Sequence, residues 1–146
     1  MRSQIFAGLA LGVVALVAGA PMESRASDEQ VSLTSVEIVR QDGNGNDNWD
    51  TITNVGLNLN TPSGSVRCDA ESFPDPSIPS NVNACADPAY SFQITGRPGY
   101  GLYTFVISHK VSDSVTLTGS TQIGCNGPIP ILCDQDHGGS ATLTAA

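Results

Sequence analysis

The sequence predicts an all-β fold: a compact antiparallel β-barrel or sandwich of about seven or more strands, held by two disulfides. Short runs rich in Val, Ile, Thr and aromatic residues follow one another from Val31 onward, and Gly, Pro, Asn and Asp separate them. The only helix-like signal, Ser27 followed by Gln30, precedes β-branched residues that lack an apolar stripe at helical spacing. The four cysteines are an even number. Together these features indicate one disulfide-bonded β-domain.

Seven runs are expected to form strands. Several of them alternate apolar and polar residues with a period of two, which is typical of half-buried strands, as in Val55–Leu57–Leu59, Tyr90–Phe92–Ile94 and Val115–Leu117. Turns join the runs, which favours an antiparallel sheet, and closing that sheet would remove its exposed edges. The seven runs are VSLTSVEIVR, DTITNVGLNLN, SVRCDA, YSFQITG, LYTFVISHKVS, SVTLTGSTQI and SATLT.

The first twenty residues have the pattern of a secretory signal peptide. A basic Arg2 precedes an apolar run, and the run ends in small residues at Ala20, where cleavage is expected. The run is shorter than the ~20 residues that span a bilayer, and no later segment is apolar for long enough. We therefore expect a secreted, extracellular protein with a signal peptide at 1–20, a flexible lead at 21–30 and a single β-domain at 31–146.

The charge of the exported chain argues against two classes of partner. Five basic and 14 acidic residues remain after the signal peptide, so the net charge is −9. Nucleic acid and anionic membranes are normally bound by a basic patch, and the basic residues here are few and scattered. We expect neither partner, and we interpret the acidity as favouring solubility rather than attraction to a basic partner.

All four cysteines lie in the exported part of the chain: Cys68, Cys85, Cys125 and Cys133. In an oxidising compartment this number predicts two disulfides, and four cysteines allow three connectivities. A zinc site is disfavoured, because neither neighbouring pair has the close spacing of structural zinc ligands and the chain has two histidines.

The segment DGNGNDN, residues 42–48, alternates Asp and Asn in the manner of a calcium-binding loop. Counting from Asp42, the sixth and twelfth positions hold Asp47 and Thr53, where such a loop has Gly and Glu. Gly and Asn also tolerate the positive φ angles of a hairpin between two strands. We interpret the segment as a turn, and we expect no metal and no cofactor.

A small secreted acidic hydrolase, such as a ribonuclease, is the alternative class. It would use His109 and His137 with a carboxylate and a cation. His109, however, alternates onto the same face as Phe105 and Ile107, and His137 lies in the glycine-rich stretch DQDHGGS, where we expect a turn. We therefore predict no catalytic residue. The further residues of that hypothesis are Glu37 or Glu71, Arg67 or Arg97, and, for a metal cluster without a fourth ligand, Asp134 and Asp136.

If the protein is a binding module, its loops should carry recognition while the sheet holds them in place. Phe73 stands in the proline-rich loop between Cys68 and Cys85, and Ile129 and Ile131 stand in the loop NGPIPIL. Trp49 follows the Asn- and Gly-rich turn. These four are the candidate binding residues. The alternative is that such side chains cover the ends of the core, and we expect this role for Ile78 and Leu132.

Several stretches resemble one family along nearly the whole exported chain, from Val31 to Thr144. VGLNLNTPSGSVRCDA, GLYTFVISHKVSD and CNGPIPILC, with the order and spacing of the cysteines, are similar to the family of the Alternaria major allergen. This family consists of small secreted fungal proteins and includes plant-immunity elicitors. The resemblance implies a compact antiparallel β-barrel, and it implies the pairs Cys68–Cys85 and Cys125–Cys133.

The chain departs from that family in one respect. The founding allergen forms a covalent dimer through a further cysteine near its mature N-terminus, and SDEQVSLTSVEIVR contains none. We therefore expect no covalent dimer, but a monomer or a weak non-covalent oligomer. The resemblance implies a non-enzymatic allergen-like effector or elicitor that binds plant defence proteins, including those of the thaumatin-like type.

Overall fold

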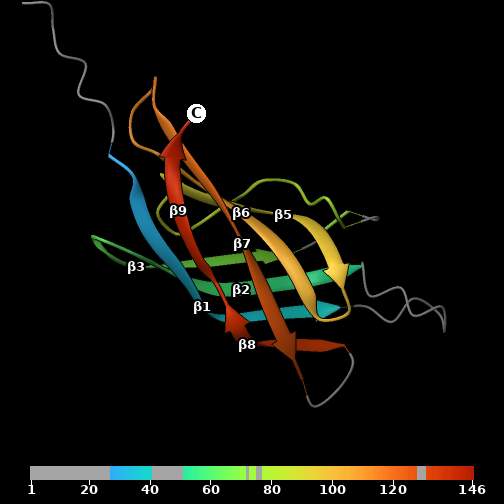
Figure 1. Ribbon diagram of the computed structural model, residues 1–146. Coiled ribbons are helices and arrows are strands. Elements are labelled where there is room, and N and C mark those ends of the chain that lie inside the picture. Colours follow the sequence, from blue (N-terminus) through green and yellow to red (C-terminus); the bar gives the residue numbers. More distant parts are fainter. Residues whose placement is uncertain (1–26, 41–50, 72, 75–76, 128–130) are drawn as a thin grey trace, which may run out of the picture.

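The computed structural model describes residues 27–40, 51–71, 73–74, 77–127 and 131–146, and within them the protein is all-β. One sheet of nine strands contains every strand of this part of the chain, and all its pairs are antiparallel (Figure 1). The predicted fold class, strand count and pair of disulfides are confirmed. The strands are β1 (Glu29–Arg40), β2 (Ile52–Thr61), β3 (Gly64–Glu71), β4 (Asn83–Ala84), β5 (Tyr90–Gly99), β6 (Leu102–Lys110), β7 (Thr116–Asn126), β8 (Leu132–Gly138) and β9 (Ser140–Ala145).

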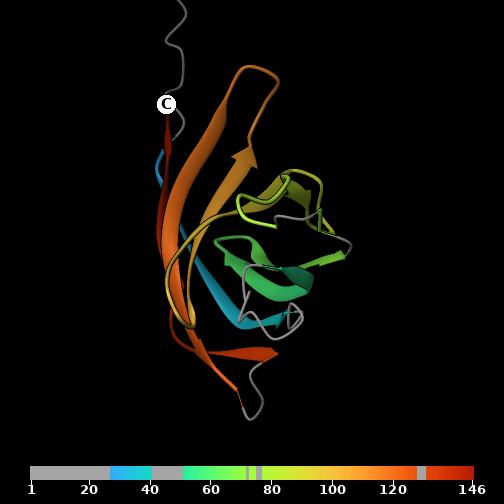
Figure 2. The same cartoon turned by 90° about the vertical axis from the view of Figure 1, so that its right-hand side faces the viewer.

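The sheet curls until its two ends meet. Its strand order is β3-β2-β1-β8-β7-β6-β5-β4, and β9 pairs with both β1 and β7. Figure 2 shows β7 and β9 as a curved wall, with β2 and β3 on the other side of the core. At the meeting point Cys68 of β3 is bonded to Cys85, with 4.1 Å between their Cα atoms, and the amide of Ala86 donates to the carbonyl of Arg67 (2.8 Å). A disulfide thus joins the two ends of the sheet order.

Two buried serines complete this closure. The hydroxyl of Ser77 accepts a hydrogen bond from the amide of Ile52 in β2 (2.9 Å). The hydroxyl of Ser80 accepts one from the amide of Ile94 in β5 (2.9 Å), and the amide of Ser80 donates to the carbonyl of Ile94 (2.8 Å). Buried backbone groups need such partners. Ser77 and Ser80 therefore supply hydrogen-bond partners to the backbone of β2 and β5 where no strand pairs with them.

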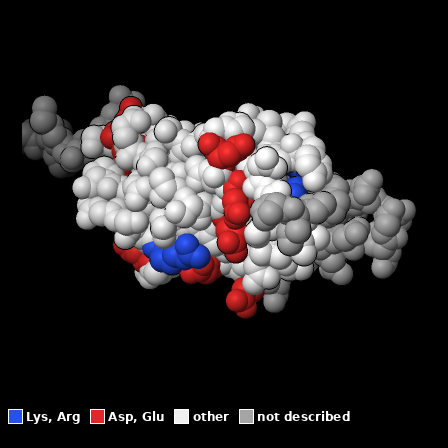
Figure 3. Space-filling model, turned by 90° about the horizontal axis from the view of Figure 1, so that it is seen from below, with Lys and Arg blue, Asp and Glu red and all other residues white. Residues whose placement is uncertain are grey.

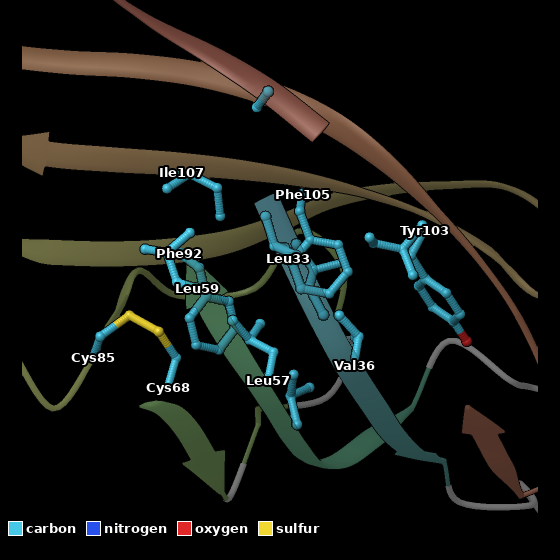
Figure 4. Close-up of a cluster of buried hydrophobic side chains, with 14 of the residues drawn as sticks. Leu33, Val36, Leu57, Leu59, Cys68, Cys85, Phe92, Tyr103, Phe105 and Ile107 are labelled. Carbon is cyan, nitrogen blue, oxygen red and sulfur yellow. A yellow bond between two sulfur atoms is a disulfide. The ribbon is translucent and has the colours of Figure 1, made fainter. Parts of the chain in front are cut away.

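The core consists of the inward side chains of this curled sheet (Figure 4). The alternation seen in the sequence is reproduced: Val55, Leu57 and Leu59 are buried along β2, and Tyr90, Phe92 and Ile94 along β5. The Cys68–Cys85 disulfide belongs to the same buried cluster.

Strand β1 changes the face that it buries. Val31 and Leu33 point into the core, and then Val36, Ile38 and Arg40 do so, because a register shift against β2 lies between Thr34 and Glu37. Ser35 lies inside this β-bulge with a positive φ of 51°. The side chain of Gln135 bridges the bulge: its oxygen accepts from the amide of Val36 (3.1 Å) and its nitrogen donates to the carbonyl of Leu33 (2.9 Å).

The strands differ from the sequence-based expectation at two places that bear on the histidines. β1 begins at Glu29 rather than Val31, because Glu29 and Gln30 pair with Leu143 and Thr142 of β9. His137, predicted to lie in a turn, is part of β8, and the turn follows at Gly138 and Gly139, whose φ angles are 83° and 103°. The signal peptide, residues 21–26 of the lead and the DGNGNDN segment lie outside the described residues.

The bulge generates the first prediction. Replacing Ser35 by Gly should keep or slightly raise stability, because Gly adopts a positive φ without a steric penalty. Replacing it by Val should lower the free energy of unfolding by about 1–2 kcal/mol or more, because a β-branched residue is a genuine outlier at this φ. Urea unfolding of both variants measures the difference. An exposed control, Ser120→Val, should change stability by no more than about 0.5 kcal/mol; equal effects at the two serines would contradict a strained bulge.

Candidate binding surface

An exposed aromatic side chain stands at the tip of the hairpin between β5 and β6. Tyr100 is 66% exposed, and its ring lies 5.3 Å from the guanidinium carbon of Arg40 and 5.7 Å from that of Arg97. Guanidinium groups at this distance are attracted to an aromatic face. The two contacts therefore hold the ring in place while most of it faces solvent.

The hairpin tip is fixed to the neighbouring strand. The amide of Cys125 in β7 donates to the carbonyl of Gly101 (2.8 Å). Gly101 has a φ of 69°, and a Cβ atom there would meet the carbonyl oxygen of Cys125 at 2.5 Å. Only glycine fits this position without displacing β7. The tip is therefore tied closely to the Cys125–Cys133 disulfide.

Ile131 lies at the same end of the molecule and is 39% exposed. Its carbonyl accepts from the amide of Arg40 (2.7 Å), and it stands two residues before Cys133, whose Cα lies 5.2 Å from that of Cys125. Arg40 thus contacts both Ile131, through its amide, and Tyr100, through its guanidinium. We call Tyr100, Arg40, Arg97 and Ile131 the Tyr100–Ile131 surface.

Arg40 is buried beneath the exposed ring of Tyr100 and connects it to the core. The residue is only 4% exposed, and its Nη1 donates to the hydroxyl of Tyr103 in the core (3.4 Å). It points inward because the bulge at Ser35 has shifted the alternation of β1 by one residue. A buried guanidinium requires such compensating contacts.

The four predicted binding residues have different outcomes. Ile131 is exposed and part of the surface just described. Phe73 is half-buried and packs against the core, as does Ile78, so the proline-rich loop covers the core here. Trp49 and Ile129 lie outside the described residues. Tyr100 is not among the predicted binding residues, although the glycines on both sides of it in RPGYGL indicate a hairpin tip.

Both cysteine pairs are those that the family resemblance implied, and the chain has no free cysteine. The described residues contain no group of three or more His, Cys, Asp or Glu side chains placed to hold a metal ion. Nor does that part of the chain contain a helix with the length and hydrophobicity of a membrane span.

On the face seen in Figure 3 the acidic side chains form separate groups between wide uncharged areas, rather than one continuous patch.

His109 belongs to a cluster inside the opposite end of the sheet. Its Nδ1 lies 2.5 Å from Oε2 of Glu29, and its ring stacks on that of Tyr90 with 4.0 Å between the ring centres. The hydroxyl of Tyr90 donates to the other carboxylate oxygen of Glu29 (2.9 Å). The carboxylate beside His109 is therefore Glu29, not Glu37 or Glu71, and it comes from the predicted flexible lead.

The two histidines do not share a site. His109 is opposite Leu117 of β7, whereas His137 is opposite Gly124, seven residues further along the same strand, which is about 23 Å. The Nδ1 of His137 instead contacts the Oδ1 of its neighbour Asp136, and its ring covers the backbone of Gly124. The arrangement in which His109 and His137 act together is not present.

The cluster around Tyr90 generates a prediction about pH. Burial, and then the hydrogen bond to Glu29, raise the pKa of Tyr90 above its usual value of 10.0. The folded protein therefore holds this proton more tightly than the unfolded chain, and the resulting stability is present below about pH 10 and is lost as the pH rises through the folded pKa. The stability difference between wild type and Tyr90→Phe, measured by urea unfolding at pH 8 and pH 11, should narrow at the higher pH. A constant difference would contradict this linkage.

Comparison of the chain with protein-family models, with curated proteins and with solved structures found no match.

Proposed function

We propose that this chain is a secreted, non-enzymatic binding protein of the allergen and effector–elicitor type, and that it binds a host plant protein through the Tyr100–Ile131 surface. The observation that carries the proposal is the exposed Tyr100 ring, held beside two arginines and close to the exposed Ile131. Tyr and Arg are enriched among the residues that dominate binding energy at protein interfaces.

The way in which these side chains are held supports the same role. The Gly101–Cys125 hydrogen bond, the Arg40–Ile131 hydrogen bond and the Cys125–Cys133 disulfide fix the backbone around them. A surface that is ordered before binding loses less conformational entropy when a partner arrives. The exposed aromatic side chain can therefore contribute most of its contact area to affinity.

Two further observations support the cellular context. The disulfides fit an oxidising compartment, which agrees with the signal-peptide pattern of the first twenty residues. The resemblance to the Alternaria major allergen family suggests plant defence proteins of the thaumatin-like type as partners. Because no cysteine is free, we propose a monomer or a weak non-covalent oligomer.

A hydrolase is the second candidate, and one observation favours it. The Glu29–His109 pair has the geometry of a carboxylate that orients a histidine for acid–base work. The nearest cation in sequence, Lys110, forms a salt bridge with Asp113 instead of facing this pair. We place this candidate second, because a phosphate substrate needs a cation at the same site.

The test of the binding proposal is affinity capture from plant extracellular fluid by the oxidised protein, followed by measurement of Kd with the purified partner. Tyr100→Ala should raise Kd at least tenfold, and Ile131→Ala should raise it by a smaller factor, because truncated anchor residues typically cost about 2 kcal/mol or more. Val82→Ala is the matched control, since Val82 is 64% exposed but lies beside β4. Unchanged binding in the Tyr100 variant would refute this surface.

A double variant separates binding from catalysis. His109→Gln with His137→Gln removes both histidines of the exported chain and should leave Kd for the partner within about twofold, provided that circular dichroism shows a folded protein. Assays with ribonuclease and other hydrolase substrates run in parallel. Hydrolysis by the wild type that disappears in this variant would favour the hydrolase candidate.

A further inference from the structure

A shallow hollow of about 500 Å³ lies where β1, β2 and β9 run side by side, near the start of β1 and the end of β2. Its lining includes Gln30, Ser32, Asn60, Thr61 and Ser140. It is separated from the Tyr100–Ile131 surface by nearly the whole of β1, about 30 Å. We propose that this hollow binds a neutral oligosaccharide.

The strand register arranges the polar groups of the hollow in a row. Ser32 pairs with Asn60 of β2 on one side and with Ser140 of β9 on the other. Side chains of directly paired residues lie on the same face, and neighbouring strands are about 4.8 Å apart. The hydroxyl of Ser32 therefore lies between the amide of Asn60 and the hydroxyl of Ser140 on the same face of the sheet.

Internal hydrogen bonds hold the two amides of the hollow in position. The Nε2 of Gln30 donates to the hydroxyl of Thr142 (2.8 Å). The Nδ2 of Asn60 donates to the hydroxyl of Thr34 (3.0 Å), with a longer bond to that of Ser32 (3.4 Å). Groups that are held in this way lose little entropy on binding a ligand.

Some hydrogen-bonding capacity is left for a ligand. Among the described residues, no hydrogen bond uses the Oδ1 of Asn60 or the hydroxyl of Ser140. A ligand that fills the hollow must therefore offer both donors and acceptors. Burying such polar groups against a partner that cannot pair with them costs free energy.

The chemistry of the lining selects the class of ligand. All its residues are uncharged, so a charged ligand would find no counter-charge there. An apolar ligand would leave the amide and hydroxyl groups without hydrogen-bond partners. Each hydroxyl of a neutral sugar is both donor and acceptor, and the ring carbons fit the apolar surface of the exposed Pro62. An uncharged sugar chain satisfies both requirements.

The test is a titration of the oxidised wild-type protein with cellohexaose, xylohexaose and N-acetylchitohexaose, with hexagalacturonic acid as the anionic counterpart. Two-dimensional NMR reports the side-chain amides of Gln30 and Asn60 and the backbone amides of Ser32 and Ser140. We expect at least one neutral hexamer to shift these signals in the millimolar range or below, and we expect hexagalacturonic acid not to do so. Absence of shifts with all three neutral hexamers, or equal shifts with the anionic one, would overturn the proposal.

Substitutions in the hollow and outside it test whether the sugar binds there. Asn60→Ala should weaken binding of the neutral hexamer at least fivefold. Ser140→Ala, which removes no side-chain hydrogen bond within the described part of the chain, should weaken it at least twofold. Thr118→Ala, on the outer face of β7 and outside the hollow, should bind as the wild type does. Tyr100→Ala should also bind the sugar normally, so this proposal and the proposed protein-binding function fail independently. Binding that survives both Asn60→Ala and Ser140→Ala would refute the site.

Discussion

Arg40 reaches the underside of Tyr100 because β1 contains one additional residue at Ser35. Before the bulge the odd-numbered residues of β1 face the core, and after it the even-numbered residues do. The backbone groups that the bulge leaves without ladder partners are bound by Gln135, which is 99 residues from Val36. Without this shift the guanidinium would point to solvent and could not hold the hairpin tip. A local irregularity of one strand therefore determines the candidate binding surface.

A second constraint is the closure of the sheet. Its two ends, β3 and β4, share no extended ladder, so the Cys68–Cys85 disulfide and the hydroxyls of Ser77 and Ser80 provide the covalent and polar connections instead. This use of the proline-rich loop explains why Phe73 packs against the core rather than facing solvent. In the proposed function, the hairpin between β5 and β6 takes the recognition role expected for that loop, because Tyr100 at its tip is 66% exposed.

The sequence predicts those features that depend on neighbours along the chain. Period-two alternation identifies β2, β5 and β6, and the even number of cysteines in an exported chain identifies the disulfides. The strand β8 could not be predicted, because Cys133 is its only buried side chain and polar residues follow it from Asp134 to His137. The role of Glu29 could not be predicted from the sequence for a different reason. Its role depends on Tyr90 and His109, which are 61 and 80 residues away, and nothing local in SDEQ marks that contact.

The bulge in β1 could be predicted from the sequence only in part. The interval of three residues between Leu33 and Val36 interrupts the alternation and is visible in VSLTSVEIVR. The interval does not reveal that Gln135 stabilises the bulge, or that Arg40 then points inward.

The alternation of side chains also determines what the start of β1 presents. Gln30 and Ser32 face outward into the hollow because Val31 and Leu33 face the core. One strand thus presents neutral polar groups at its start and a buried cation at its end. The two proposed surfaces share no residue and lie at opposite ends of β1, so the two proposals together imply that a sugar chain and a protein partner could be bound at the same time. Such a molecule would hold its protein partner close to a glycan-bearing surface without any change in fold.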